Sequence, residues 1–439
     1  MDGAAQVWSE RAGSAHLKSG EQSVFAAERQ CRPALRHFLS NSSGLFALAR
    51  PLPAGGASRM PGNGPAPMSG SAHKFPHRFD WRPASGMLTE IDSCSEPSDS
   101  HLFASPAYVR AFQSMQAVHD LVAERGDMPA ATLLFRVERG RATMLTEFVD
   151  FSAEDMEHAA GAVFQRFPDV GVVSMPAVQR RHALERFPAR CYTDRADIVI
   201  ALPDTTEAYT ASLSQSTRST VRNRLNRLRR EHPSMTVRAE DGWSADPDLI
   251  SRLVAMSNAR LSDTGRHSYN DAGMVHNFHR LAATSRSLLL TIWIDGQLCG
   301  GSWNVRAGSG YFGFINTFDQ RYSRYSLGML SAYLSVCEAI RQGARRFHTG
   351  WQRYDYKYQL GGAEQPSWRY EIYRSQLHCV RRAPQIVLDV AEDRMRQLKT
   401  WMQAPERRNR FLTRAATASV NRVRALAGRH TDRAAAKDR

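Results

Sequence analysis

The sequence lacks any run of about 18 consecutive apolar residues, the length that a membrane-spanning helix needs. It also has little cysteine. The six cysteines are scattered and never spaced as Cys-x-x-Cys: Cys31, Cys94, Cys191, Cys299, Cys337 and Cys379. Neither a disulfide framework nor a zinc-binding cluster is therefore expected, and the composition is typical of a reducing compartment. We predict a cytoplasmic protein without a transmembrane helix.

Acidic residues are the other shortage. The chain of 439 residues has 43 Asp/Glu and 58 Lys/Arg, a formal net charge of +15. The excess concentrates in residues 376–439, where fifteen Arg/Lys stand against six Asp/Glu. Such a basic tail can bind nucleic acid or an anionic membrane surface, although a solvated helical tail is the commoner explanation. The length and the hydrophobic content of 42% allow two or three domains with packed cores.

Residues 1–75 do not have the composition of a folded domain. Pro51–Met68 is dense in Pro, Gly, Ala and Ser, as linkers are. The apolar run Leu45–Leu48 is too short for the core of a signal peptide. Because Met60 and Met68 stand just before the expected folded region, we predict a disordered leader or an over-extended translation start.

The most informative segment is Ser287–Gly362. Hairpin turns at Asp295-Gly296 and Ala307–Gly310 join three apolar runs, which predict the strands Ser287–Ile294, Leu298–Arg306 and Tyr311–Thr317. Apolar residues then recur at helical spacing through Ser326–Gln342, and Ala344–Thr349 is a short further strand. The chain thus passes from a strand through a glycine-containing turn into a helix.

That turn is a candidate phosphate-binding site. A strand–turn–helix junction exposes backbone N–H groups, and the helix dipole adds partial positive charge there. The residues expected around a bound pyrophosphate are Arg321, Arg324, Ser326, Leu327, Gly328 and Met329. The alternative is an ordinary turn, and the order of the elements around it favours the phosphate site.

A similar order of elements is predicted earlier in the chain. Ser105-Pro106 has the pattern of an N-cap followed by proline at the first helical position, and it opens a helix over Ala107–Ala117. The strands and the helix that follow are Ala131–Arg136, Thr143–Phe148, Ala153–Arg166, Val170–Met175 and Asp197–Leu202. This β–β–α–β order is repeated later, so we expect a duplicated fold with a degenerate first copy.

Arginines crowd another predicted helix, Arg218–Arg230. Val221, Leu225 and Leu228 recur at helical spacing and form a narrow apolar stripe, which leaves a basic face. That face either binds a phosphorylated donor or an anionic acceptor, or lies in solvent between domains. Aromatic residues for base stacking are absent from the stretch, which disfavours nucleic acid.

Three motifs together resemble the GNAT acyltransferase superfamily, in the branch of CelD-like acetyltransferases and Fem-type peptidoglycan aminoacyltransferases. The first is the basic helix after the lead-in Leu213-Ser214. The second is Phe318-Asp319…Tyr322…Ser326-Leu327-Gly328, which is similar to the turn and helix of that family. The third is Arg346-Phe347-His348-Thr349-Gly350…Tyr356-Lys357. The resemblance covers about Ser105 to Arg374.

The resemblance implies a fold and a division of the chain. The fold is of the α/β (α+β) class, with a mixed central sheet flanked by helices and two tandem GNAT-like halves. The expected parts are residues 1–75 as a leader, 76–210 as the degenerate half, 211–375 as the acyltransferase domain and 376–439 as a basic helical tail. The implied donor is acetyl-coenzyme A or another acyl-coenzyme A, and no metal is expected.

The implied activity is N-acyl transfer to a small-molecule amine or sugar, including an envelope or polysaccharide precursor. One alternative is a Fem-type transferase whose donor is aminoacyl-tRNA, with the tRNA bound by the basic segments. Another is a non-catalytic protein that binds an anionic polymer or membrane surface, which would place it peripherally at the inner face of the membrane.

Direct acyl transfer needs an acid for the leaving thiolate and deprotonation of the acceptor amine. The superfamily often places its acid after the strand Ala344–Thr349, so the resemblance implies Tyr354 or Tyr356. Asp319 is either the base or the cap of the turn that follows it.

The chain departs from the family pattern at two positions. Leu327 replaces a proline, which leaves the glycine and the helix start in place. His348 replaces an aspartate at a strand end. Histidine titrates near neutral pH, so His348 is either a replacement base or a hydrogen-bonded core residue.

Contacts with the acceptor are also implied. In this superfamily a helix–loop–helix covers the acceptor pocket, and here Leu249–Leu261 and Ala272–Ala283 have that pattern. The implied substrate contacts are Asp263, His267, Tyr269 and, for an anionic group of donor or acceptor, Lys357. His276 and His279 have a possible metal spacing, but nearby acids and cysteines are too few, so surface histidines explain them better.

Two further helices are predicted near the C-terminus. One is an amphipathic helix that docks on the fold through Ile386, Val387, Val390, Leu398 and Trp401. The other, Phe411–Leu426, is basic and amphipathic and can lie on an anionic membrane.

Overall fold

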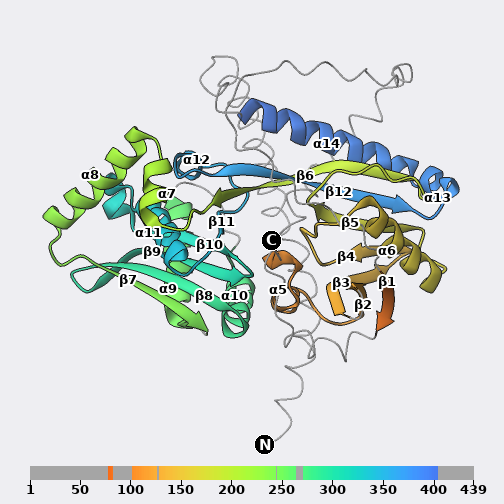
Figure 1. Cartoon of the computed structure of the whole chain (residues 1–439), viewed down its shortest axis with the longest axis horizontal. Coiled ribbons are helices and arrows are strands. Elements are labelled where there is room, and N and C mark those ends of the chain that lie inside the picture. The colour runs from red at the N-terminus through yellow and green to blue at the C-terminus, as the bar shows by residue number, and fades with distance from the viewer. Residues whose placement is uncertain (1–77, 83–100, 126–127, 244, 264–269, 404–439) are drawn as a thin grey trace, which may run out of the picture.

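The computed structural model of the chain describes residues 78–82, 101–125, 128–243, 245–263 and 270–403 (Figure 1). The predicted leader over residues 1–75 and the predicted helix Phe411–Leu426 lie outside these residues. Within the described residues, no helix combines the length and the apolar character that crossing a bilayer requires.

The first set of elements runs to residue 201. In chain order it comprises β1 Arg78–Arg82, η1 Leu102–Ala104, α5 Pro106–Phe112, β2 Val118–Arg125, β3 Met128–Glu138, β4 Arg141–Met144, α6 Ala153–Arg166, β5 Val172–Val178 and β6 Ala189–Ala201.

The second set follows. It comprises α7 Thr206–Ser212, α8 Gln215–Glu231, β7 Thr236–Trp243, α9 Pro247–Asp263, α10 Ala272–Thr284, β8 Arg286–Ile294, β9 Gln297–Ala307, β10 Gly310–Phe318, η2 Gln320–Tyr325, α11 Leu327–Arg341, β11 Arg346–His348, α12 Asp355–Gln359, β12 Ala363–Tyr373, α13 Gln376–Arg381 and α14 Ala383–Gln403.

The described strands form one twelve-stranded sheet in the order β1-β2-β3-β4-β5-β12-β6-β11-β10-β9-β8-β7. Its two ends have the same internal order. In the N-terminal half, β1 to β4 are antiparallel neighbours, β4 and β5 are parallel, and β12 is antiparallel to β5. In the C-terminal half, β7 to β10 are antiparallel, β10 and β11 are parallel, and β6 is antiparallel to β11. The predicted mixed sheet with two tandem halves is thus confirmed.

The last strand of each half comes from the other part of the chain. β6 follows β5 in sequence but pairs with β11, whereas β12 follows β11 but pairs with β5. β6 and β12 also pair with each other and join the halves. This exchange of strands places Val199–Ala201 beside β11 in the C-terminal half, and Trp368–Tyr373 beside β5 in the N-terminal half.

Local sequence signals explain several elements. Ser152 and Asp155 form a reciprocal capping box at the start of α6. Asp295 and Gly296 both have positive φ, 51° and 73°, as the tight turn between β8 and β9 requires. Ser105 caps α5 by accepting from the Tyr108 N–H, as predicted.

Other predictions need correction. The helix expected over Ala107–Ala117 ends at Phe112, because Gln113 is already extended. Four strands were not predicted: β1, β2, β7 and β12. Most described residues of β7 are exposed at the sheet edge, so this strand lacks the apolar pattern that would identify it. Charged residues and Pro366 similarly disguise the first part of β12.

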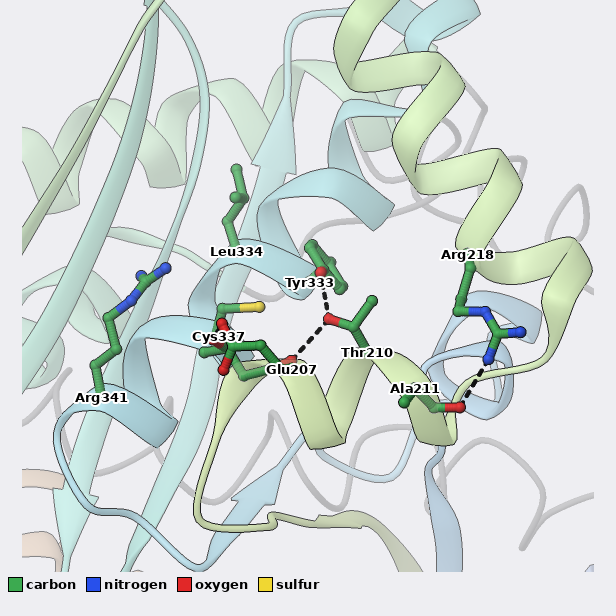
Figure 2. Close-up of a pocket in the computed structure, with 9 residues that line it drawn as sticks. Glu207, Thr210, Ala211, Arg218, Tyr333, Leu334, Cys337 and Arg341 are labelled. Carbon is green, nitrogen blue, oxygen red and sulfur yellow. Dashed lines mark hydrogen bonds between the residues drawn. The ribbon is translucent and has the colours of Figure 1, made fainter.

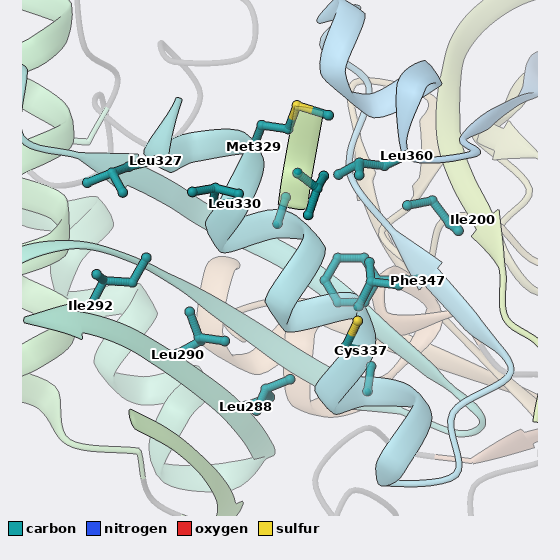
Figure 3. Packing of buried hydrophobic residues seen from close by; sticks show 14 of the residues in the cluster. Ile200, Leu288, Leu290, Ile292, Leu327, Met329, Leu330, Cys337, Phe347 and Leu360 are labelled. Atoms are coloured by element: carbon teal, nitrogen blue, oxygen red, sulfur yellow. The ribbon is translucent and has the colours of Figure 1, made fainter. Parts of the chain in front are cut away.

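Helices cover both faces of the C-terminal half (Figure 1). On one face, α7, α8 and α11 pack on β6, β8 and β11 through a core that includes Ile200, Leu290, Leu330 and Phe347 (Figure 3). On the other face, a second core joins α9 and α10 to η1, α5, β9 and β10. This second core brings the start of the N-terminal half against the C-terminal half.

Candidate functional site

The parallel strands β10 and β11 separate after three pairs of residues. Their last pair is Phe312 with His348. Beyond it, β10 continues beside β9 alone, and the Thr349 N–H donates to the Ile198 carbonyl on β6. A bulge between Gly313 and Ile315 interrupts the β10 register at the same point. We call this divergence, with its apex at Phe312 and His348, the β10–β11 fork.

Helix α11 begins at the wide end of the fork. Ser326, which precedes it, has φ 55° and makes no side-chain cap, and no acidic residue lies in the first turn. Gly328 lies against the Phe318 ring, where an added Cβ would be 3.1 Å from two ring carbons. The first N–H groups of α11 therefore face no carboxylate of their own helix, as an anion site requires.

The two predicted arginines flank this turn and are exposed. Arg321 pairs with Asp319 at 2.6 Å, and Arg324 pairs with Glu231 of α8 at 3.1 Å. Two-thirds of the Arg321 side chain remains accessible to solvent. Both guanidinium groups can therefore exchange a surface carboxylate for a bound phosphate at modest cost.

Asp319, predicted as base or cap, is the N-cap of η2. It accepts a hydrogen bond from the Arg321 N–H at 2.9 Å. The hydrogen bond from the Arg321 guanidinium lowers the pKa of Asp319. A carboxylate held in this way is a poor proton acceptor, so the geometry favours the cap.

His348 lies at the apex of the fork and is part of a buried polar cluster. Its Nδ1 is 2.6 Å from Oδ2 of Asp197 on β6, and its ring stacks on Phe312 with centroids 3.9 Å apart. His101, which precedes η1, has its Nε2 3.7 Å from the same carboxylate oxygen. We call these three side chains the His101–Asp197–His348 cluster.

Charge in this cluster resides on the carboxylate. Burial alone would raise the pKa of Asp197, but the two histidines outweigh it and lower this pKa below its ordinary value. Burial lowers the pKa of His101 to about 4, so this ring is neutral near pH 7. An ionised Asp197 accepts the Nδ1–H of His348, which fixes the tautomer and leaves the lone pair of His348 on Nε2.

One nitrogen or oxygen atom from each of the three residues lies within 4.8 Å of the others, so a metal site must be considered. The Phe103 N–H donates to Nδ1 of His101 at 3.3 Å, which places the proton of that ring on Nε2. A protonated Nε2 does not coordinate a metal. The donor set therefore fits a hydrogen-bonded cluster better than a metal site.

The two candidate tyrosines lie at the start of α12. Asn316 on β10 donates to the Tyr356 hydroxyl at 3.3 Å and to the Gly328 carbonyl at 2.9 Å, which links α12 to the start of α11. Burial raises the pKa of Tyr356, so its hydroxyl stays protonated. Tyr354 stacks on Tyr356 but makes no contact of this kind with β10 among the described residues.

Lys357 is buried beside the apex. Its Nζ donates to the carbonyls of Thr349 and Gly350, which follow β11. Burial lowers the pKa of Lys357 to about 8. In this position the buried lysine fixes the segment after the strand.

The predicted acceptor contacts lie apart from this cluster or outside the description. Asp263 is the exposed last residue of α9, and His267 and Tyr269 belong to undescribed residues. On the same side as His101, Arg195 pairs with Glu147 at 2.5 Å and lies over the exposed Trp351 ring.

Sequence reasoning missed Asp197 and His101. Asp197 begins the apolar run of a predicted strand, and an isolated acid in such a run was an available signal. Nothing in the sequence pairs it with His348, which lies 151 residues away.

A pocket of about 520 Å³ lies elsewhere, between α7, α8 and α11 (Figure 2). Arg218 donates to the Ala211 carbonyl there, and the Thr210 and Tyr333 hydroxyls are 2.8 Å apart. Apart from Arg218 of the predicted basic helix, none of the predicted catalytic or donor-binding residues lines it.

Comparisons with known proteins bear on the family of one segment and on the fold. Residues 215–358 match the acetyltransferase (GNAT) domain family. The structure of FemX has a TM-score of 0.51 and 10% identity, over 68% of this chain and 98% of FemX. A tandem GNAT protein from the clavulanic acid biosynthesis pathway has a TM-score of 0.35 and 12% identity, over 68% of this chain and 98% of that chain.

A third structure is the C-terminal domain of a putative lysylphosphatidylglycerol synthetase from Agrobacterium fabrum. It has a TM-score of 0.42 and 12% identity, over 67% of this chain and 92% of that domain. Of these three structures, FemX alone has a TM-score above 0.5, and at 10% identity its likeness shows a shared fold and nothing more. No curated protein matches the chain. Residues 215–358 thus match the acetyltransferase (GNAT) domain family, and the described chain shares its fold with FemX.

Proposed function

We propose that the protein transfers an acyl group from an acyl-coenzyme A to an amine, borne by a small molecule or a sugar. The β10–β11 fork is the observation that carries this proposal. Its diverging strands leave main-chain groups of β10 beyond Phe312 without a partner in β11, and its wide end meets the uncapped start of α11.

The donor fits along this fork. The pyrophosphate binds the first N–H groups of α11 around Gly328, with Arg321 and Arg324 at its edge. The pantetheine arm pairs with the edge of β10 that β11 leaves free. The thioester then lies near the bulge, where Phe314 falls out of the β9–β10 register and its N–H can face the thioester oxygen.

The reaction needs two proton transfers. His348 takes a proton at Nε2 from the acceptor amine as its nitrogen attacks the thioester carbon. The carbon–sulfur bond breaks, and the Tyr356 hydroxyl donates a proton to the leaving thiolate. Asp197 and His101 position His348 and do not touch the substrate. His348 then releases its proton to solvent, and Tyr356 regains one from solvent. The products are the N-acylated acceptor and free coenzyme A.

Acyl-coenzyme A binding tests the proposal directly. Isothermal titration with acetyl-coenzyme A should show saturable binding, and Arg321→Ala with Arg324→Ala should weaken it about tenfold, since each guanidinium contributes a charge-assisted contact. Arg341→Ala is the matched control, because Arg341 is an exposed arginine at the opposite end of α11. Titrations without binding for any of a panel of acyl-coenzyme A donors would overturn this donor assignment.

A second candidate donor is aminoacyl-tRNA, and α8 is the observation that favours it. This helix carries exposed arginines and lies beside the wide end of the fork, where Arg224 donates to the Arg324 carbonyl. Salt-sensitive binding of aminoacyl-tRNA, without binding of acyl-coenzyme A, would select this donor. Thiol release during turnover, measured against a panel of amines, would select acyl-coenzyme A instead.

A further inference from the structure

The outer surface of α13 and α14 is unusually apolar for an exposed surface. Among the described residues, nine large hydrophobic side chains are exposed, and six of them lie on these two helices: Leu377, Val380, Val387, Val390, Met395 and Leu398. The exposed fractions of Val380, Val387 and Met395 exceed one half. We call these six residues the α13–α14 surface.

This surface reverses the predicted orientation of α14. Val387, Val390 and Leu398 were expected to dock on the fold, yet they point to solvent. Polar residues make the contact with the sheet instead. Asp393 accepts from the Thr193 N–H at 2.9 Å, Arg396 donates to the Thr193 carbonyl at 3.1 Å, and Asp389 is buried near Arg369.

Charge is distributed unevenly between the two faces of α14. The acids Asp389 and Asp393 contact residues of the sheet, and the third acid of α14, Glu392, is half-buried, so none of the three is among the exposed residues. The exposed charged side chains of α13 and α14, within the described residues, are Arg381 and Arg394. The outer face is therefore apolar and basic, without an exposed carboxylate.

We propose that the α13–α14 surface binds an anionic lipid membrane, with α14 lying in the plane of the interface. An interfacial helix combines an apolar face with basic residues, and each basic residue near an anionic surface strengthens the attraction to it. α14 has 21 residues and is about 32 Å long, and it runs along one side of the molecule (Figure 1). Residues 404–439, which continue from it, carry ten Arg/Lys and three Asp/Glu, so their charge acts in the same direction.

The same charges disfavour a second copy of the chain as the occupant. A two-fold dimer would place this surface against itself. Arg381 and Arg394 would then face like charges without a carboxylate from the outer face to pair with them. A membrane containing acidic lipid supplies the negative charge that a second copy does not.

Vesicle sedimentation of the full chain tests this proposal, independently of the acyl transfer reaction. The protein should sediment with phosphatidylcholine vesicles that contain phosphatidylglycerol, and far less with phosphatidylcholine alone. Val387→Asp with Met395→Asp should lower the apparent partition coefficient at least about tenfold, since two apolar side chains lose their burial. Val237→Asp with Trp243→Asp is the matched control, because it makes the same charge change at two exposed apolar positions on β7.

Each other outcome overturns the proposal. Unchanged sedimentation of the Val387→Asp, Met395→Asp protein would assign binding to residues 404–439 or another basic segment. Equal binding to both vesicle types would remove the charge argument. A dimer seen by light scattering, and lost in the same variant, would make a second copy the occupant. Hydrogen exchange of the wild-type protein gives a measurement free of any folding defect, and the α14 amides should exchange more slowly when anionic vesicles are present.

Discussion

The two halves of the sheet share one strand order. They differ beyond the third residue pair of the parallel ladder that each half contains. In the C-terminal half, β10 and β11 diverge after Phe312 and His348. In the N-terminal half, the ladder ends at Thr143 and Ser174, but the segments that follow the two strands are hydrogen-bonded to each other again beyond it. The Phe148 N–H donates to the Ala177 carbonyl at 2.8 Å, so no equivalent fork exists among the described residues there.

The helices that follow show the same contrast. α6 begins with a capping box and carries Glu154 and Asp155 in its first turn. α11 begins without a side-chain cap and without an acid. A helix start that supplies its own carboxylate satisfies its N–H groups and repels an anion, whereas an uncapped one can bind an anion.

Buried polar groups follow this division as well. Ser174 and Arg141 both bond to the buried Glu371, which compensates the carboxylate within the fold. At the corresponding place in the other half, His101 Nε2 and Asp197 Oδ1 are buried and find no hydrogen-bond partner among the residues that the structure describes. One duplicated architecture thus holds a saturated cluster in one half and an incompletely satisfied cluster in the other, and the second is the better candidate for catalysis.

The largest effect should come from His348. His348→Gln removes the proposed proton acceptor and should lower kcat by about 100-fold or more, with a smaller change in KM. Ser174→Ala, at the corresponding strand position of the other half, should leave kcat within about twofold. Equal losses of kcat in both variants would show that both clusters act only by stabilising the fold.

Stability should show the reverse contrast. Glu371→Gln leaves Arg141 without its carboxylate and should lower the free energy of unfolding by about 3 kcal/mol, measured with urea. Asp197→Asn leaves no cation unpaired, so we expect it to lower the free energy of unfolding by only about 1 kcal/mol. Glu364→Gln, in a more exposed pair with Arg353, is the control and should cost less still. A larger loss for Asp197→Asn than for Glu371→Gln would contradict the assignment of roles.

The pH dependence of stability should identify His101. Its pKa is about 4 in the folded protein, below the ordinary value of 6.5. Between these values the unfolded chain binds a proton that the folded chain does not, so stability falls as pH falls from 6.5 to 4. The full pKa shift corresponds to a loss of at most about 3 kcal/mol in the free energy of unfolding. The free energy of unfolding of the wild type and of His101→Gln should be measured across this pH window. The difference between the two proteins should narrow as the pH falls, and parallel plots of stability against pH would contradict the burial of a neutral His101.

The smallest effect concerns the helix starts. Ser152→Ala removes the cap of α6 and should lower the free energy of unfolding by about 1 kcal/mol. Ser326→Ala should change it by only a few tenths, because Ser326 makes no side-chain cap for α11. Thermal unfolding of the two variants side by side would measure this, and comparable losses would mean that α11 is capped in solution.

Much of the local structure could be read from short-range signals. The helix at Ala153–Arg166 was predicted with the bounds of α6, and the strands around Asp295-Gly296 with nearly those of β8 and β9. These elements depend on caps, turns and periodicity within a few residues. β7 and β12 escaped prediction because an edge position and paired charges hide the apolar alternation on which such a reading depends.

The candidate site divides in the same way. The glycine turn at Gly328 and the sequence from His348 to Lys357 were visible as motifs, and the GNAT family match includes them. The cap role of Asp319 and the burial of Lys357 required the structure, since identical residues could have faced a ligand.

By itself, then, the sequence determined many of the helices and hairpins and the motifs of the GNAT-like segment, because hairpins, caps and helices form between neighbouring residues. Only the tertiary structure decided that β6 and β12 exchange places, that Asp197 meets His348 across 151 residues, and that the apolar side of α14 faces outward. The physical reason is common to all three. Each depends on a contact between distant parts of the chain, whose partner no local pattern specifies.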